Sequence, residues 1–253
     1  MSRLQPNIDC YISPNAASLK LMKRSLKHIA RIKQVFCVFV LSAHTWMSAA
    51  AQSLNPASSG YATESINIRE IDNLVQLGFS DLRDGYSKRA IHTFEQAKRL
   101  DPTNGKIRFG LARALQDDEQ KTRALEEYTI SIFLDPGNAK AYTNRALVKG
   151  SLQDLAGALD DLDAAIKIDR HLAPAYMNRG ITLAALNKPK MAIEDFDRAI
   201  EIDPRYADAY RNRGITRNFL GNLHGACNDW KQAGSLGQPE PWSWYRQLCR
   251  VNS

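Results

Sequence analysis

The stretch Ala173–Tyr206, APAYMNRGITLAALNKPKMAIEDFDRAIEIDPRY, decides the fold because much of the chain repeats its pattern. Residues of the same kind return every 34 positions on both sides of it. A small residue marks one place in five consecutive units: Gly78, Ala112, Ala146, Gly180 and Gly214. A large apolar residue marks a second place: Phe94, Tyr128, Leu162, Phe196 and Trp230. Self-similarity at such a period is typical of an array in which each unit packs on its neighbours.

Each unit is predicted to be a pair of helices. In Ala173–Tyr206 the apolar and small residues recur at spacings of three and four, in two runs that break near Asn187. This spacing indicates two helices joined by a tight turn. Pro174 and Pro189 stand where a first helical turn begins, and Pro204 ends the second helix because the residue before a proline avoids the helical region. The unit is therefore expected to be a helical hairpin.

The hairpin resembles a known repeat. The residues that match the signature of the tetratricopeptide repeat are Tyr176, Gly180, Ala192, Phe196, Ala199 and Pro204. The resemblance extends over five units, at residues 71–104, 105–138, 139–172, 173–206 and 207–240. It implies an all-α fold, a right-handed superhelical solenoid of five helix-turn-helix units whose first helices line a concave groove. A short capping helix is expected over residues 241–253.

The N-terminal segment has the pattern of a secretory signal peptide. Basic residues up to Lys33 are followed by the apolar run Val35–Leu41 and then by small residues, so cleavage is expected after Ala51. The apolar run is shorter than the roughly 20 residues that a membrane span needs, although an uncleaved anchor or an organelle transit peptide is an alternative. The basic region has an ordinary length if the true start is Met22. Residues 52–65 are expected to be a flexible linker and residues 66–240 the repeat array.

Charge argues against a nucleic-acid partner. The chain carries a net charge of +7, but residues 1–51 hold seven of the 34 basic residues and one of the 27 acidic residues. The remainder has 27 basic and 26 acidic residues and is nearly neutral. A nearly neutral body lacks the basic surface that binds a phosphate backbone.

The last three units share residues that point to a binding surface. Asn144, Asn178 and Asn212 recur on the expected first helices, and a row of amides can hydrogen-bond the backbone of an extended peptide. Helical phase adds neighbours that would strengthen binding: Thr143, Leu147, Met177, Ile181, Arg211 and Ile215. The alternative is that these amides only cap or bridge the backbone between repeats. Some tetratricopeptide repeat proteins hold a C-terminal carboxylate with Lys and Asn, but Val75 and Phe79 stand where that arrangement would start.

The asparagines are followed by arginines that recur together with aspartates. Arg145, Arg179 and Arg213 are each sixteen residues before an aspartate, at Asp161, Asp195 and Asp229. The first two units have Leu77 and Leu111 in place of the arginines. We expect an ion pair between the two helices of a hairpin, partly exposed and worth at most about 1 kcal/mol.

The C-terminal end is expected to cap the last hairpin. Residues that could cover Trp230 are Trp242, Trp244, Tyr245 and Leu248. After cleavage only Cys227 and Cys249 remain, and in an oxidising compartment they could form a disulfide; the alternative is a small buried thiol.

The sequence shows no enzyme motif. The histidines fall at different places in different repeats, so no metal site is expected, and there is neither a phosphate loop nor a nucleophile motif. No cofactor is expected. The sequence predicts an exported, non-enzymatic scaffold, periplasmic or extracellular, that binds an unidentified protein or peptide. Alternatives are a structural spacer or self-assembling solenoid, an enzyme accessory subunit, and membrane attachment through an uncleaved N-terminal segment.

Overall fold

A computed structural model describes residues 60–249, apart from the side chains of residues 60–67, Glu240 and Trp242. The expected signal peptide at 1–51, most of the expected linker and residues 250–253 lie outside the described part. The capping role expected of the Trp242 side chain also lies outside it.

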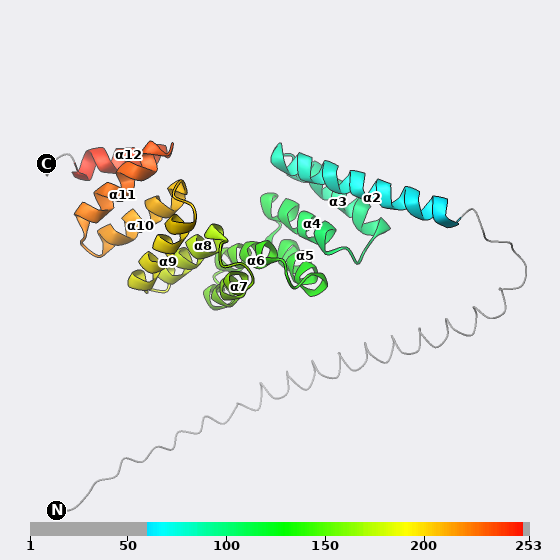
Figure 1. Ribbon diagram of the computed structural model, residues 1–253, viewed down its shortest axis with the longest axis horizontal. Coiled ribbons are helices and arrows are strands. Elements are labelled where there is room, and N and C mark those ends of the chain that lie inside the picture. Colours follow the sequence, from blue (N-terminus) through cyan, green and yellow to red (C-terminus); the bar gives the residue numbers. More distant parts are fainter. Residues whose placement is uncertain (1–59, 250–253) are drawn as a thin grey trace, which may run out of the picture. The chain divides into compact units, whose positions relative to one another are not determined.

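Within residues 60–249, ten main helices form five successive pairs (Figure 1). The first helices of the pairs are α2 (Gly60–Arg83), α4 (Gly105–Asp117), α6 (Ala139–Ser151), α8 (Ala173–Ala185) and α10 (Ala207–Phe219). The second helices are α3 (Ser87–Leu100), α5 (Lys121–Leu134), α7 (Leu155–Ile168), α9 (Pro189–Ile202) and α11 (Leu223–Ser235). The expected all-α array of paired helices is confirmed.

Helix α2 begins earlier than the sequence suggested. It starts at Gly60, inside the range 52–65 that was expected to be a flexible linker. Each residue added to an existing helix gains one backbone hydrogen bond for one fixed residue, so a packed helix extends readily through residues with no packing role. A polar, aperiodic composition is therefore a weak guide to where a helix starts.

Small residues on the first helices make room for large residues on the second helices. A Cβ atom added to Gly180 would lie 2.6 Å from Cε1 of Phe196, and one added to Gly78 would lie 2.7 Å from Cζ of Phe94. Phe196 and Phe94 are almost fully buried, as are the alanines near them on the same helices. The recurring small and large positions of the sequence are therefore the contact between the two helices of each hairpin.

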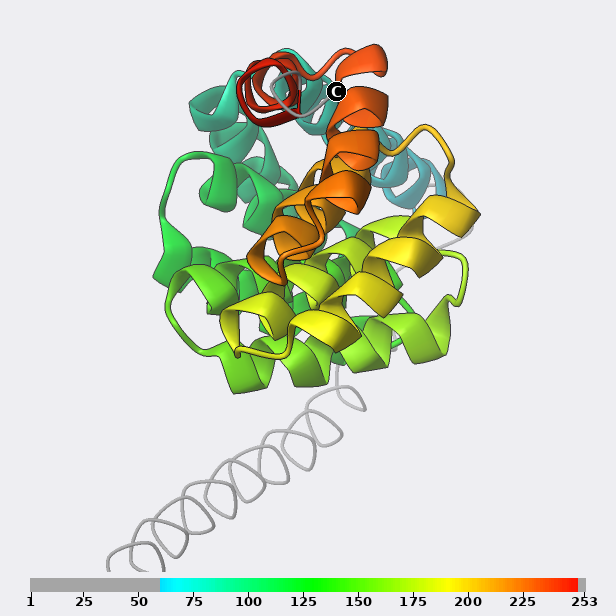
Figure 2. The same ribbon diagram turned by 90° about the vertical axis from the view of Figure 1, so that its left-hand side faces the viewer.

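Consecutive hairpins pack on one another in chain order. Each second helix contacts the first helix of the next hairpin, as α5 does with α6 and α7 does with α8. Figure 2 shows α6 to α9, in yellow-green and yellow, lying against one another. The first helices also contact each other directly, α4 with α6, α6 with α8 and α8 with α10. They therefore form one continuous surface, which we call the first-helix face.

The C-terminal segment packs on the last hairpin. Helix α12 (Pro239–Trp244) continues into a π-helical turn at Tyr245–Cys249, and both contact α11. The Trp230 ring, which is 2% exposed, meets the Trp244 ring edge to face at 5.6 Å. Cys227 and Cys249 form a disulfide with Cα atoms 5.8 Å apart. The segment thus has the position expected of a cap.

None of the helices in residues 60–249 combines the length and the apolar character needed to cross a bilayer.

Candidate functional site

The first-helix face carries all nine residues that the sequence singled out for binding. They lie on α6, α8 and α10; Thr143 and Asn178 are buried there, and three of the others form a partly exposed apolar row. The apolar row consists of Leu147, Ile181 and Ile215, each between 41% and 42% exposed. Apolar side chains at this exposure, one on each of three adjacent helices, form a surface that a partner could cover.

Arginine clamps fix the helices that carry this face. Arg179 donates from Nε to Oδ2 of Asp195 at 2.8 Å and from Nη2 to Oδ1 at 2.7 Å. Arg145 makes the same two-pronged contact with Asp161, at 2.8 and 2.6 Å, and Arg213 makes it with Asp229. The predicted ion pair between the two helices of one hairpin is confirmed in these three units.

The clamps are more buried than the sequence suggested. The aspartate side chains are 5%, 8% and 3% exposed for Asp161, Asp195 and Asp229, because they point inward from the second helix. The value of about 1 kcal/mol predicted for the net contribution of a partly exposed pair does not describe the cost of removing the arginine alone. Removing one partner of a buried pair leaves an uncompensated charge and costs about 3–5 kcal/mol.

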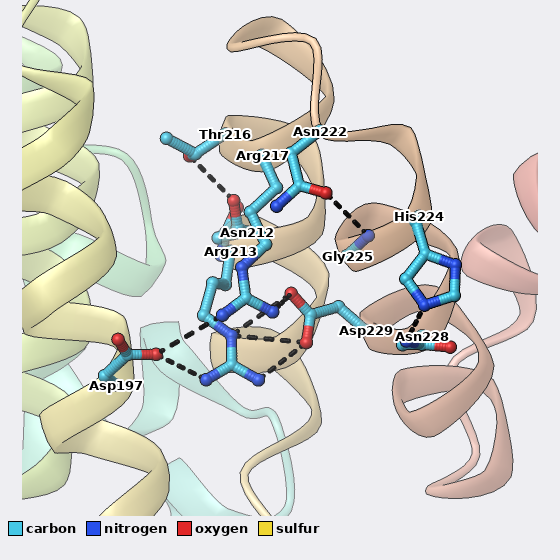
Figure 3. A network of polar contacts seen from close by, with 10 residues as sticks. All are labelled: Asp197, Asn212, Arg213, Thr216, Arg217, Asn222, His224, Gly225, Asn228 and Asp229. Carbon is cyan, nitrogen blue, oxygen red and sulfur yellow. Dashed lines mark hydrogen bonds and ion pairs between the residues drawn. The ribbon is translucent and has the colours of Figure 1, made fainter.

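The arginines also join consecutive hairpins, which the sequence interpretation missed. Nη1 of Arg179 donates to Asp163 of the preceding hairpin at 2.7 Å, and Nη1 of Arg213 donates to Asp197. Figure 3 shows Arg213 between Asp197 and Asp229, with Arg217 also reaching Asp229. Burial of Arg213 opposes its charge, but the hydrogen bonds and charges of both aspartates outweigh this and raise the pKa of the guanidinium. The arginine therefore stays charged and holds three helices together.

An aromatic ring completes each clamp. The guanidinium carbon lies over the ring of the tyrosine three residues earlier, at 5.7 Å for Tyr142, 5.6 Å for Tyr176 and 5.3 Å for Tyr210. A cation over an aromatic face is attracted by the ring's electron density. The signature tyrosines of the last three units therefore position the arginines as well as filling space.

The second unit uses a different ion pair. Glu127 takes the place of the aspartate and binds Nη1 of Arg108 at 2.9 Å and Nζ of Lys98 at 3.1 Å. Lys98 belongs to the preceding hairpin, so this contact also joins two units. The sixteen-residue spacing did not predict this pair, because Arg108 lies three positions before the place of the usual arginine, which Leu111 occupies.

The three predicted amides have different surroundings. Nδ2 of Asn212 donates to the carbonyl oxygen of Asp208 on its own helix at 2.9 Å and lies 4.0 Å from Sδ of Met177. Asn144 contacts the hydroxyl of buried Tyr128, which donates to Gln116 at 2.8 Å. Asn178 is only 6% exposed and its side chain makes no hydrogen bond within residues 60–249. The amides therefore do not form a uniform exposed row.

An apolar cavity of about 380 Å³ lies between α6, α7 and α8. Three of the predicted residues, Leu147, Asn178 and Ile181, line it together. The rest of its lining is uncharged and consists of Ala146, Gly150, Ser151, Gln153, Leu155, Leu162, Thr182 and Ala185. We call it the apolar cavity.

A second hollow of about 450 Å³ lies between α2, α4 and the first turns of α6 and α8. Two phenylalanines and two cations, Phe79, Phe109, Arg113 and Lys140, form most of it together with Thr143 and Asn144. Its lining includes no acidic residue. We call it the cationic pocket. Sequence reasoning missed it because it assigned the first two units no binding role, although they supply three of these residues.

The remaining predicted residues have separate positions. Met177 and Ile215 lie on the first-helix face beyond both hollows, and Arg211 is half-buried with its Nε atom 3.8 Å from Asp208. Among residues 60–249 no group of histidine, cysteine or acidic side chains could hold a metal ion. The site is therefore made of hydrogen-bonding, cationic and apolar side chains.

Comparisons with known proteins agree with this architecture. The family described as tetratricopeptide repeat matches residues 139–172 and 173–206. Residues 139–206 are therefore tetratricopeptide repeats, and they lie within an all-α array of paired helices. No curated protein matches the chain.

Solved structures show the same fold. Pseudomonas aeruginosa pilF aligns with a TM-score of 0.63 and 19% identity, over 68% of this chain and 78% of that chain. TTC0263, a thermophilic TPR protein in Thermus thermophilus, aligns with a TM-score of 0.62 and 19% identity, over 70% of this chain and 98% of that chain. YrrB, a TPR protein with an unusual peptide-binding site, aligns with a TM-score of 0.56 and 18% identity, over 76% of this chain and 100% of that chain. Identities this low show a common fold only.

Proposed function

We propose that this chain is an exported, non-enzymatic scaffold that holds a segment of a protein or peptide against its first-helix face. The observation that carries the proposal is the apolar cavity, where α6 and α8 bring Leu147, Asn178 and Ile181 together. A concave apolar site with a few polar groups is the usual form of a binding site. The peptide-binding site named for YrrB supports the proposal by analogy.

Export is proposed on two features. The basic, apolar and small-residue order of residues 1–51 is that of a signal peptide. The Cys227–Cys249 disulfide is of the kind that persists in oxidising compartments, such as the periplasm or the extracellular space. Membrane attachment through an uncleaved segment is the alternative.

Binding can be tested by placing a charge on the apolar row. Leu147→Glu and Ile181→Glu put a carboxylate on the first-helix face, whereas Ile168→Glu puts one at a site of matching exposure, 41%, on the second helix α7. We expect crosslinking and pull-down with wild type and Ile168→Glu to recover the same partners, and the other two variants to lose them. Retention of every partner by Leu147→Glu and Ile181→Glu would refute the proposal.

Export can be tested independently. A reporter enzyme that is active only outside the cytoplasm, fused after Ser253, should be active, and N-terminal sequencing of the purified protein should begin at Gln52. An inactive reporter would exclude export. A protein that fractionates with membranes and retains residues before Gln52 would support the anchored alternative.

A further inference from the structure

The apolar cavity is shaped to receive one large side chain. A Cβ atom added to Gly150 would meet no heavy atom within 4 Å, so the space beside this residue is open. Its walls are uncharged, and its volume of about 380 Å³ is within the range of sites that enclose small ligands. An uncharged hollow of this size favours an aliphatic or aromatic side chain over a polar one.

Asn178 can hydrogen-bond an occupant of the cavity. Its side chain lines the cavity and makes no hydrogen bond within residues 60–249. The residue is 6% exposed, and its amide atoms are not among the fully buried polar atoms without a partner, so they reach the open space of the cavity. A peptide backbone supplies both an N–H and a C=O, which match the acceptor and donors of this amide.

The cationic pocket selects a different side chain. Neither Arg113 nor Lys140 takes part in an ion pair among the described residues, and no acid lines the pocket. By contrast, each clamp arginine of the first-helix face, Arg145, Arg179 or Arg213, is neutralised by a carboxylate. Two uncompensated cations beside Phe79 and Phe109 favour an acidic side chain whose methylene groups rest on the rings.

The two hollows lie at a spacing that one extended peptide can bridge. On α6 the cationic pocket uses Lys140, Thr143 and Asn144, and the apolar cavity uses Ala146, Leu147 and Gly150. The midpoints of these sets are separated by roughly 8 Å at about 1.5 Å per helical residue. On α8, Pro174 lines the cationic pocket and Ile181 lines the apolar cavity, and the same rise places them about 10 Å apart. A segment in the polyproline II conformation rises about 3.1 Å per residue and completes one turn in three residues, so side chains three residues apart lie roughly 9 Å apart on one face.

We propose that the partner presents a segment in the polyproline II conformation, with an internal acidic side chain in the cationic pocket and a large apolar side chain, about three residues away, in the apolar cavity. The backbone beside the apolar residue hydrogen-bonds Asn178. This inference rests on the proposed function, since it specifies the chemistry of the segment held by the first-helix face. It also extends the binding surface into the first two units through Phe79, Phe109 and Arg113.

The test is a selection from a random peptide library with amidated C-termini, using the full chain as bait. We expect enrichment of peptides that pair Glu or Asp with Leu, Ile, Met or Phe at this spacing. The affinity of one enriched peptide is then measured by fluorescence anisotropy. Gly150→Leu, which fills the cavity, and Lys140→Glu, which reverses the pocket charge, should each weaken binding by about tenfold or more.

Two matched variants control for changes elsewhere. Ala156→Leu and Lys167→Glu make the same kinds of change at exposed positions of α7 and should leave the affinity unchanged. Circular dichroism checks that all four variants keep their helical content. Enriched peptides that lack the acidic and apolar pair, or that bind both Gly150→Leu and Lys140→Glu normally, would overturn the inference while leaving the proposed function standing. Failure to enrich any peptide, together with partner binding unaffected by Leu147→Glu and Ile181→Glu, would overturn both.

Discussion

Glycine inside a helix normally weakens it by about 0.5–1 kcal/mol relative to alanine, yet Gly180 lies within α8. An added Cβ would lie 2.6 Å from Phe196, so Gly180→Ala should destabilise the protein by about 1–3 kcal/mol through overpacking. Gly150 lies within α6 but faces open space, so Gly150→Ala should stabilise by about 0.5–1 kcal/mol. Urea denaturation followed by circular dichroism measures both. If both substitutions changed the free energy of unfolding in the same direction, the contact with Phe196 would not be the reason for glycine at position 180.

A second prediction at the residue scale concerns the arginine clamps. Arg179→Ala should cost about 3–5 kcal/mol of unfolding free energy, because it leaves the carboxylate of Asp195, 8% exposed, without its partner. Arg198→Ala is the control, since Arg198 and Glu201 form an exposed pair and should contribute nothing measurable. Thermal and urea denaturation compare the two variants.

The clamp can be distinguished from a packing effect with a double variant. Arg179→Met combined with Asp195→Leu removes both charges and keeps most of the side-chain volume, so it should recover most of the lost stability. A double variant that is less stable than Arg179→Ala would mean that the charges themselves stabilise the hairpin.

Sequence separation predicts contacts between the two helices of one hairpin. The Arg–Asp pairs could be predicted because the same sixteen-residue spacing returns in three units, and a hairpin fixes where such residues meet. Contacts between hairpins were missed, although Asp163 and Asp197 each precede a clamp arginine by the same spacing. The angle at which hairpins stack depends on side chains of both units, so the pattern of one unit does not specify it.

The candidate site likewise depends on contacts between units, which the pattern of a single unit does not predict. Helical phase placed Asn178 on the first-helix face, and the structure has it lining the apolar cavity there. Its burial depends on neighbouring α6, which the phase of α8 alone cannot describe. The cationic pocket was missed for a related reason, since Arg113 and Lys140 come from different units and become neighbours only after the units stack.

At the scale of the C-terminal element, the disulfide should hold the cap on α11. It closes a loop with a sequence separation of 22 residues, for which the chain-entropy estimate is about 3 kcal/mol. Reduction should therefore loosen α12 and the following turn before the hairpins unfold, exposing Trp230 to water and shifting its fluorescence to longer wavelength. A variant with both Cys227→Ser and Cys249→Ser should be insensitive to reductant. Identical fluorescence and melting of the oxidised and reduced wild type would contradict a stabilising role.

For the whole molecule, the net charge conceals how the charges are used. The chain after residue 51 has 27 basic and 26 acidic residues, which argued against a nucleic-acid partner. The buried clamps pair arginines with aspartates and so use charges of both signs, which means that the net charge does not show where unpaired charges lie. Arg113 and Lys140 lie together in a pocket without an acidic residue although the protein is nearly neutral. A local excess of positive charge suits a single acidic side chain better than a polyanion.

The array should respond to damage locally, because the helices in close contact within residues 60–249 belong to the same hairpin or to successive hairpins. Leu162, 1% exposed on α7, is a core residue of the third unit, and Leu162→Ala should cost about 2–5 kcal/mol. Hydrogen exchange followed by mass spectrometry should show the largest loss of protection in α6 to α9 and the smallest in α2, α3, α11 and α12. Leu152→Ala, at a 46% exposed position, is the control and should leave every helix protected. An equal loss of protection in all helices after Leu162→Ala would instead mean that the hairpins unfold as one cooperative block.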